Sequence, residues 1–292
     1  MKQFSKVCLA MAACGALTLS NPSFALNILL TNDDSWETTN IQVMKSTLEA
    51  AGHDVIMSAP CTGQSGKGGA MTFLKPVSVD ETQSADQEYC VGDTDTSVAF
   101  SSFAEGTPVM AAIYGIDVAA QAVWGQDPDL VISGPNEGNN LGYMNNNSGT
   151  LGAAMISLSR GIPAIAVSAN SNTPEEMNST MGYKFTDVGW NGGGALLKFS
   201  DDLSTDSTAL YYTMQSLIAG GMTSEEAQAA ATSALSGKQG LTFTTGDAGD
   251  TSEDSEGIAV NEGYITISTI DGNVQAARGK VALVSQRLIG LK

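Results

Sequence analysis

The chain has 292 residues, of which 31 are acidic and 13 are basic, so its formal net charge at pH 7 is −18. This excess of carboxylates repels nucleic-acid backbones and anionic lipid surfaces at long range, so we expect neither a nucleic-acid duplex nor a membrane surface as a partner. The single histidine, His53, rules out a histidine-rich zinc site and disfavours a Ser-His-Asp triad. Its position in a predicted turn indicates a surface loop residue.

Residues 1–25 have the pattern of a secretory signal peptide. Lys2 and Lys6 precede an apolar run over residues 7–19, and Ser23-Phe24-Ala25 forms a small-x-small cleavage site. The apolar run is too short to span a bilayer, which takes about 20 apolar residues, and no later stretch qualifies. We therefore expect no membrane insertion and an exported protein, periplasmic or secreted, whose residues 26–292 form one domain.

Two cysteines, Cys61 and Cys90, lie beyond the predicted signal peptide. In an oxidising compartment they can form one disulfide. Two buried free thiols remain the alternative on sequence grounds.

The first half of the predicted domain alternates strands and helices. A strand over Asn27–Thr31, a helix over Thr39–Ala50 and a strand over Val55–Ala59 form a βαβ unit. The same alternation continues with a helix over 108–123, a strand over 130–132, a helix over 150–160 and a strand over 162–168. This order predicts an α/β fold with a doubly wound, mostly parallel sheet.

The second half has a different pattern. Residues 170–240 indicate mainly helix, and Thr223 with Glu226 has the form of a capping box ahead of an Ala-rich helix. Residues 245–257 are rich in Gly, Asp, Ser and Glu, which predicts an exposed loop without the spacing of a calcium loop. Residues 263–270 alternate as a strand does, and Asp271-Gly272 is a turn signal, so a β-extension is expected near the C-terminus.

Four polar segments, three of them rich in glycine, follow the predicted strands or precede a predicted helix. They are Asn32-Asp33-Asp34-Ser35, residues 60–69, residues 133–142 and residues 147–152. Because the carboxyl ends of parallel strands meet at one edge of a sheet, these segments are expected to form one site.

The residue types in these segments favour chemistry on a phosphate. Asp33 and Asp34 with hydroxyl and amide oxygens form a hard oxygen ligand set, which suits magnesium, manganese or calcium rather than zinc. Residues 148–150 at a helix start offer N–H groups and the positive end of the helix dipole to an anion. The combination predicts phosphoryl transfer or phosphate hydrolysis.

Each of these features has a simpler structural explanation as well. Asp33-Asp34 alone could be a helix N-cap pair, the glycine-rich loops could merely turn the chain, and Lys67 could be solvated instead of steering a phosphate. Gly66-Lys67 lacks the spacing of a P-loop, and Asp93-Thr94-Asp95-Thr96 is predicted as a loop and not as an aspartyl-phosphate motif. No Gly-x-Ser-x-Gly elbow is present, which disfavours a serine esterase.

Taken together and in this order, these motifs resemble the SurE family of survival-protein nucleotidases and acid phosphatases. The resemblance is carried by Thr31-Asn32-Asp33-Asp34, Ala59-Pro60 with Ser65-Gly66, Gly106-Thr107-Pro108, Ser133-Gly134-x-Asn136-x-Gly138-x-Asn140-x-Gly142, Ser148-Gly149-Thr150, residues 161–168 and residues 262–267. It covers about two-thirds of the chain beyond residue 25, because residues 172–255 match poorly.

The resemblance implies a Rossmann-like domain and a divalent metal, Mg²⁺ or Mn²⁺, used to hydrolyse nucleoside 5′- or 3′-monophosphates or other small phosphomonoesters to the alcohol and phosphate. It also implies a homodimer or homotetramer formed through C-terminal β-extensions, here from about residue 258. Residue by residue, it assigns metal ligation to Asp33, Asp34, Ser65 and Asn136, catalysis to Asp33 and Asp34, and the phosphate site to Asn32, Gly66, Ser148, Gly149 and Thr150.

The chain departs from the family pattern at three positions near the predicted site. Ser35, Gln64 and Gly69 stand where glycine, a basic residue and histidine are usual, and these changes affect the expected substrate preference more than the metal set. Two alternatives remain from the sequence. One is a metal-dependent nucleotide- or phosphate-binding protein without catalysis, and the other is a calcium-stabilised interaction protein that uses its acidic surface.

Overall fold

The structure is a computed structural model that describes residues 25–94, 97, 99, 103–169, 181–246, 250, 252–272 and 286. The predicted signal peptide, apart from Ala25, and most of the chain after Gly272 therefore lie outside the described residues. Asp95 and Thr96 of the rejected aspartyl-phosphate motif lie outside them as well.

Within the described part of the chain, no helix has both the length and the apolar character needed to cross a membrane.

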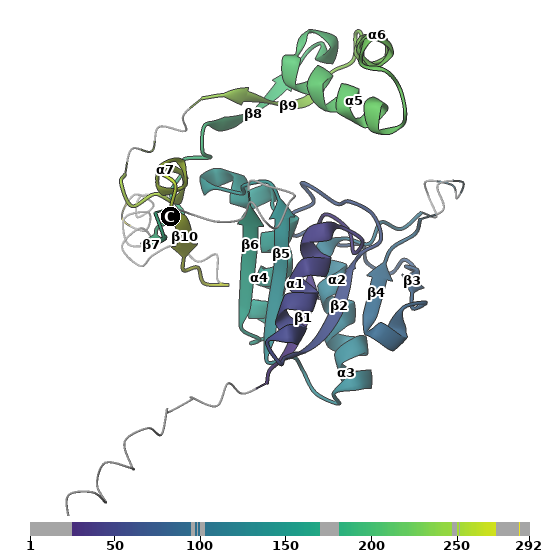
Figure 1. The fold of residues 1–292 in the computed structure, drawn as a ribbon, viewed down its shortest axis with the longest axis vertical. Coiled ribbons are helices and arrows are strands. Elements are labelled where there is room, and N and C mark those ends of the chain that lie inside the picture. The colour runs from purple at the N-terminus through teal and green to yellow at the C-terminus, as the bar shows by residue number, and fades with distance from the viewer. Residues whose placement is uncertain are drawn as a thin grey trace, which may run out of the picture.

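Six strands form the main sheet in the order β3-β4-β2-β1-β5-β6 (Figure 1). Their bounds are β1 Asn27–Thr31, β2 Asp54–Pro60, β3 Val79–Asp80, β4 Glu88–Val91, β5 Leu130–Glu137 and β6 Ala164–Ala169. All neighbouring pairs are parallel except β3 with β4. The doubly wound, mostly parallel α/β sheet predicted from the sequence is thus confirmed.

Helices cover both faces of this sheet. They are α1 Thr39–Ala50, α2 Pro108–Tyr114, a π-helical turn Gly115–Ala119, α3 Ala120–Val123 and α4 Gly149–Ser159. Strand β1 shows why both faces are apolar, because successive strand residues point to opposite sides of a sheet. Ile28 and Leu30 pack with Ile41 of α1, whereas Leu29 packs with Ile116 beyond α2. The predicted helix over 108–123 is confirmed, with the π-turn inside it.

Two parts of the main sheet differ from the sequence prediction. Strand β5 runs to Glu137, although residues 133–137 were expected to be loop. Gly134 has φ +112°, and the register to β6 shifts between Ser133 and Asn136, so the glycine bends the strand without ending it. Strand β4 was not predicted, because Glu88 made the run look polar; the carboxylate is buried against Lys45 at 3.0 Å.

Cys61 and Cys90 form a disulfide, with an S–S distance of 2.04 Å. It joins the segment directly after β2 to β4, and both residues are buried. The alternative of two free thiols is therefore wrong. His53 is half-buried rather than fully exposed, since its Nδ1 accepts a hydrogen bond from the Leu26 N–H at 3.2 Å.

The second half contains more strand than the sequence predicted. Its elements are β7 Tyr183–Thr186, β8 Ala195–Ser200, α5 Ser207–Ala219, α6 Ser224–Leu235, β9 Gly240–Thr245, α7 Glu256–Asn261 and β10 Ile265–Ser268. Strands β8 and β9 form an antiparallel ribbon, and β7 pairs in parallel with β10. The helical expectation for residues 170–240 is right for α5 and α6 and wrong for β7 and β8, and β9, which begins where that segment ends, was not predicted. The capping box of Thr223 and Glu226 is confirmed at the start of α6.

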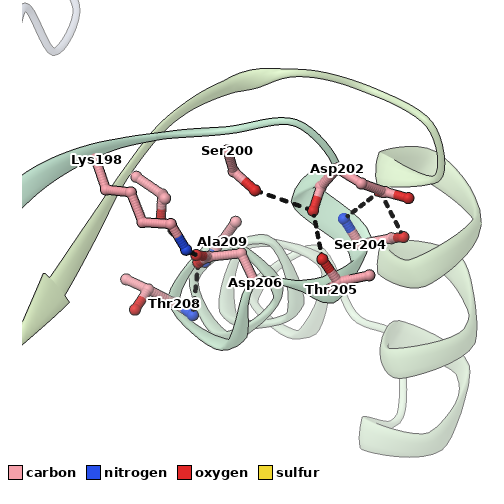
Figure 2. A network of polar contacts seen from close by, with 9 residues as sticks. Lys198, Ser200, Asp202, Ser204, Thr205, Asp206, Thr208 and Ala209 are labelled. Atoms are coloured by element: carbon pink, nitrogen blue, oxygen red, sulfur yellow. Dashed lines mark hydrogen bonds and ion pairs between the residues drawn. The ribbon is translucent and has the colours of Figure 1, made fainter.

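The β8–β9 ribbon and the two helices between its strands project away from the main sheet (Figure 1). Figure 2 shows the polar network at the base of these helices, where two aspartates act as caps. Asp202 Oδ1 accepts from the Ser204 N–H and from Gly237 N–H, and Asp206 Oδ1 accepts from the N–H groups of Thr208 and Ala209. Asp206 thus satisfies the first N–H groups of α5, while Asp202 caps the short 3₁₀ turn Leu203–Thr205 and holds Gly237, just after α6, against that turn.

Residues 255–257 are buried, although residues 245–257 were predicted as an exposed loop. Glu256 begins α7, and its Oε1 accepts hydrogen bonds from the Gly142 N–H at 2.9 Å and from Asn145 Nδ2 at 2.8 Å. Its Oε2 accepts from the Ser268 hydroxyl at 2.6 Å. The predicted C-terminal β-extension thus starts with a helix, followed by the short strand β10.

Candidate functional site

The sheet has its topological switch point between β1 and β5. The chain leaves β1 toward β2 on one side, and β5 leads to β6 on the other. In open α/β sheets the crevice beyond the carboxyl ends of such strands is where ligands bind. Asp33 and Asp34 follow β1 at this point, and Asn136 and Glu137 end β5.

Asp33 is enclosed between β1 and the N-terminus of α4. Its side chain is 2% exposed, and Oδ1 accepts a hydrogen bond from the Thr150 hydroxyl at 2.6 Å. Burial raises the pKa of Asp33, while the Thr150 hydroxyl and the N–H groups of Gly149 and Thr150 oppose that rise. The positive end of the α4 dipole therefore faces a carboxylate of the protein itself.

Gly149 allows α4 to approach Asp33 this closely. A Cβ at position 149 would lie 2.8 Å from Asp33 Cβ and 2.8 Å from Pro108 Cγ. Both distances are shorter than real carbon contacts, so a side chain at this position forces α4 away from Asp33. The glycine of the predicted phosphate motif is thus required by packing around the aspartate.

Asp34 is half-buried beside Asp33 and is held from β5. Its Oδ2 accepts a hydrogen bond from the Glu137 N–H at 2.7 Å. Burial raises the pKa of Asp34 to about 6; the Glu137 N–H opposes this rise, and the negative charges of Asp33 and Glu137 add to it. Two adjacent carboxylates therefore share a site that disfavours their charge.

The segment after β2 lies against both parts of this site. The Gln64 N–H donates to the backbone oxygen of Asp33 at 2.7 Å, and the Gly68 N–H donates to that of Asn147 at 3.1 Å. The segment carries Ser65 and Gly66, both exposed, between these two anchors. Within the described residues no hydrogen bond joins the Ser65 side chain to either aspartate, so its place as a ligand remains a prediction.

The other predicted site residues have their side chains partly engaged already. Asn32 is buried and uses Nδ2 to donate to the Ser35 backbone oxygen at 2.8 Å, so it shapes the turn that presents the aspartates. Asn136 donates through Nδ2 to the Gly138 oxygen at 2.7 Å, and its Oδ1 is the atom with which it could ligate a cation. Ser148 Oγ accepts from Leu151 N–H at 3.1 Å as the cap of α4.

The donor set fits a hard divalent cation. No lysine or arginine of the described residues forms an ion pair with Asp33 or Asp34, so the charge of the pair is not balanced by the protein. No group of three or more His, Cys, Asp or Glu side chains suited to a metal occurs in the described part of the chain. The set of two carboxylates completed by neutral oxygens is typical of magnesium or manganese rather than zinc.

Some contributors to the site were missed by the sequence analysis. The Glu137 and Gln64 N–H groups act through the backbone, which leaves no trace in the side-chain pattern. The sequence did contain a signal for Gly152, because a glycine inside a predicted helix often marks a close packing contact. A Cβ there would lie 2.1 Å from the Gly68 backbone oxygen, so α4 and the segment after β2 touch at Gly152.

Residues 28–191 match the profile of a protein family described as Survival protein SurE. A 5′-nucleotidase SurE of Paramagnetospirillum magneticum is 31% identical over 206 residues, which are 68% of this chain and 72% of that protein. A 5′-nucleotidase SurE of Methanosphaera stadtmanae is 37% identical over 162 residues, 56% of this chain and 57% of that protein. An acid phosphatase of Yarrowia lipolytica is 38% identical over 161 residues, 53% and 44% of the two chains.

The chain spans about half the length of most of the curated relatives it matches. Among solved structures, the SurE protein from Aquifex aeolicus is similar with a TM-score of 0.60, covering 89% of this chain and 99% of that one. At 22% sequence identity this likeness shows the fold.

Proposed function

Because the chain belongs to the SurE family, we propose that it is a metal-dependent phosphomonoesterase that hydrolyses nucleoside 5′- or 3′-monophosphates to nucleoside and phosphate. The observation that carries the proposal is the adjacent pair of Asp33, buried at the N-terminus of α4, and half-buried Asp34, neither of which has a cationic partner among the described residues. The relatives named above support it, since their names are 5′-nucleotidase and acid phosphatase. No observation favours a binding protein without catalysis.

We propose that Asp33, Asp34, Asn136 and Ser65 hold one Mg²⁺ or Mn²⁺ ion. A divalent cation at this place supplies Lewis-acid polarisation of a phosphoryl oxygen. The protein fixes the two carboxylates for it from separate elements, Asp33 through Thr150 of α4 and Asp34 through Glu137 of β5. Such fixed ligands need little reorganisation during the reaction.

We propose that the phosphate lies beside the same helix N-terminus. Ser148 caps α4, and the N–H groups of Gly149 and Thr150 face the Asp33 carboxylate, so the phosphate would lie next to this carboxylate at the positive end of the helix. Gly66 has φ +79° and open space where a side chain would be, so its backbone can approach an anion closely. Asn32 contributes by holding the turn at Ser35 that presents the aspartates.

The test is release of inorganic phosphate by the purified protein from a panel of phosphomonoesters that includes 5′- and 3′-nucleoside monophosphates. Each is assayed with Mg²⁺, with Mn²⁺ and with a chelator. We expect metal-dependent release from at least one nucleoside monophosphate and none with the chelator. Binding of AMP without phosphate release in any metal would contradict the proposal and favour a binding protein.

Measurements of thermal stability should test for cation binding at Asp33 and Asp34 independently of activity. The pKa of Asp34 is about 6 in the fold against an ordinary value of 3.8, so between these pH values the folded state holds more protons than the unfolded state. The free energy of unfolding of the metal-free protein therefore falls as pH rises through this window. Saturating Mg²⁺ or Mn²⁺ binds the ionised pair and should raise Tm by about 5 °C at neutral pH.

The same cation should have a clearly smaller effect near pH 5, where protons compete for the carboxylates. Differential scanning fluorimetry at both pH values, with Ca²⁺ in parallel, measures this difference. An equal gain in Tm at both pH values, or no gain with any of these cations, contradicts the placement of the cation at Asp33 and Asp34.

We propose that the protein is exported, periplasmic or secreted, after removal of residues 1–25. The pattern of these residues supports this, as does the Cys61–Cys90 disulfide, because disulfides persist in oxidising compartments. N-terminal sequencing of the protein recovered outside the cytoplasm is expected to begin at Leu26.

We propose a homodimer or homotetramer. The β8–β9 ribbon exposes four apolar side chains that are cross-strand partners, Leu197 with Phe243 and Phe199 with Leu241; Phe199 is 63% and Leu241 is 71% exposed. Light scattering after size exclusion should give the mass of two or four chains. Phe199→Glu with Leu241→Glu should reduce it to one chain, whereas Val43→Glu on α1 should not; an unchanged mass in the double variant contradicts a role for the ribbon.

A further inference from the structure

Lys67 is the one cationic residue in the four polar segments that surround the candidate site, residues 32–35, 60–69, 133–142 and 147–152. The other charged side chains there are Asp33, Asp34 and Glu137, in a chain whose net charge is −18. A dianionic phosphate approaching this site meets a field of its own sign. A positive side chain within the site therefore adds to the attraction that a bound cation provides for the phosphate.

The backbone places Lys67 between the two halves of the site. Its N–H donates to the Gln64 oxygen at 3.2 Å, and Gln64 is bonded through its own N–H to Asp33. The next residue, Gly68, is bonded to Asn147 immediately before the cap of α4. Lys67 thus sits on a short turn that spans from the aspartates to the helix N-terminus, and its long flexible stem can reach over the crevice.

The Lys67 ammonium is paired with the Glu105 carboxylate in this structure. Both side chains are partly exposed, at 37% and 48%, and exposed ion pairs of this kind contribute little to stability. Glu105 leads into α2, whose Pro108 packs beside Gly149 at the start of α4. The pair therefore lies at the rim of the site, where exchanging one anion for another costs little.

We propose that Lys67 is a phosphate-binding residue of the reaction, and that Glu105 is an internal competitor which the substrate phosphate displaces. The inference rests on the proposed function for its substrate class, a phosphomonoester. Lys67 acts on binding of the phosphate, so its effect falls on KM and on the affinity for inorganic phosphate more than on kcat. Glu105 has the opposite effect, because its carboxylate occupies the ammonium in the free protein.

The experiment titrates inorganic phosphate calorimetrically into the full-length mature chain with Mg²⁺ present, and measures KM and kcat for AMP in parallel. Lys67→Met should weaken phosphate binding and raise KM by about tenfold, the usual size for a hydrogen bond to a charged group. Lys67→Arg should keep most of the affinity. Lys238→Met, on the exposed connection between α6 and β9, is the control for the change in net charge.

The Glu105 variants make the test specific. Glu105→Gln should tighten phosphate binding severalfold, and this gain should vanish when Lys67→Met is also present, since the two residues act through one contact. The salt dependence of kcat/KM should be weaker in Lys67→Met. Unchanged phosphate affinity in Lys67→Met, a loss in Glu105→Gln, or no phosphate binding by the wild type overturns the inference.

Failure of the proposed function gives a different result. Phosphate binding that depends on Lys67, without release of phosphate from any phosphomonoester, refutes catalysis and leaves Lys67 as a phosphate ligand. Metal-dependent hydrolysis with an unchanged KM in Lys67→Met would support the proposed enzymatic function and show that Lys67 does not bind the phosphate.

Discussion

Replacing Asp34 by asparagine is expected to lower kcat/KM for AMP by about three orders of magnitude, because a metal-bound phosphoryl group gains several kcal/mol from the cation. The fold should survive, since the asparagine oxygen can still accept the Glu137 N–H. The fold disfavours the charge of Asp34, whose pKa it raises to about 6, so a neutral side chain should give an equal or higher Tm at neutral pH. Activity and stability therefore move in opposite directions.

Asp129→Asn is the matched control for this variant. Asp129 lies at the opposite end of the same pair of strands, and its Oδ2 accepts the Asn27 N–H at 2.9 Å, as Asp34 accepts that of Glu137. Steady-state kinetics and thermal melts of both variants, with and without Mn²⁺, separate the loss of a carboxylate from the loss of this site. Full activity in Asp34→Asn would contradict the assignment of the aspartate pair as metal ligands.

Gly152→Ala should damage both the fold and the candidate site. An alanine normally favours a helix over glycine by about 1 kcal/mol. Here its Cβ would lie 2.1 Å from the Gly68 oxygen, so α4 and the turn that carries Ser65 must separate. We expect a loss of about 1–3 kcal/mol in the free energy of unfolding from overpacking, and a fall of about a hundredfold in kcat/KM from the displaced turn.

Gly69→Ala adds the same methyl group to the facing segment, where nothing lies within 4 Å of the new Cβ. Urea unfolding and AMP hydrolysis of the two variants should differ accordingly, with Gly69→Ala close to wild type. Equal stability and activity in both alanine variants would contradict the close approach of α4 to this turn.

The first half of the fold could be predicted because local pattern and tertiary structure agree there. The apolar residues of β1 and the helical spacing of α1 indicate the same βαβ unit that the sheet requires. Strand β4 could not be predicted, since Glu88 is acceptable in a buried strand only because Lys45 reaches it from α1. The end of β5 could not be predicted either, because Gly134 and Pro135 usually stop a strand, and here pairing with β6 continues beyond them.

The second half was harder for a different reason. Strand β10 was predicted from the alternation of residues 263–270, whereas β7 was not, because it is four residues long and its partner β10 lies 82 positions further along the chain. In the candidate site, the sequence indicated which side chains could ligate a metal or cap a helix. Asp33 and Thr150 were both among them, and the structure joins them by a hydrogen bond. It could not indicate that backbone N–H groups of Gln64 and Glu137 set the positions of the two aspartates.

The buried carboxylate of Glu256 connects α7 to the segment that precedes α4. The match to the family profile ends at residue 191, and every predicted metal and phosphate residue lies before it. The Gly142 N–H and the Asn145 amide nevertheless have Glu256 as their acceptor, directly ahead of the residues that begin α4. A chain truncated after residue 191 keeps all the predicted site side chains and removes the acceptor of these two donors, so we expect the smallest stable fragment that holds the site to extend through α7.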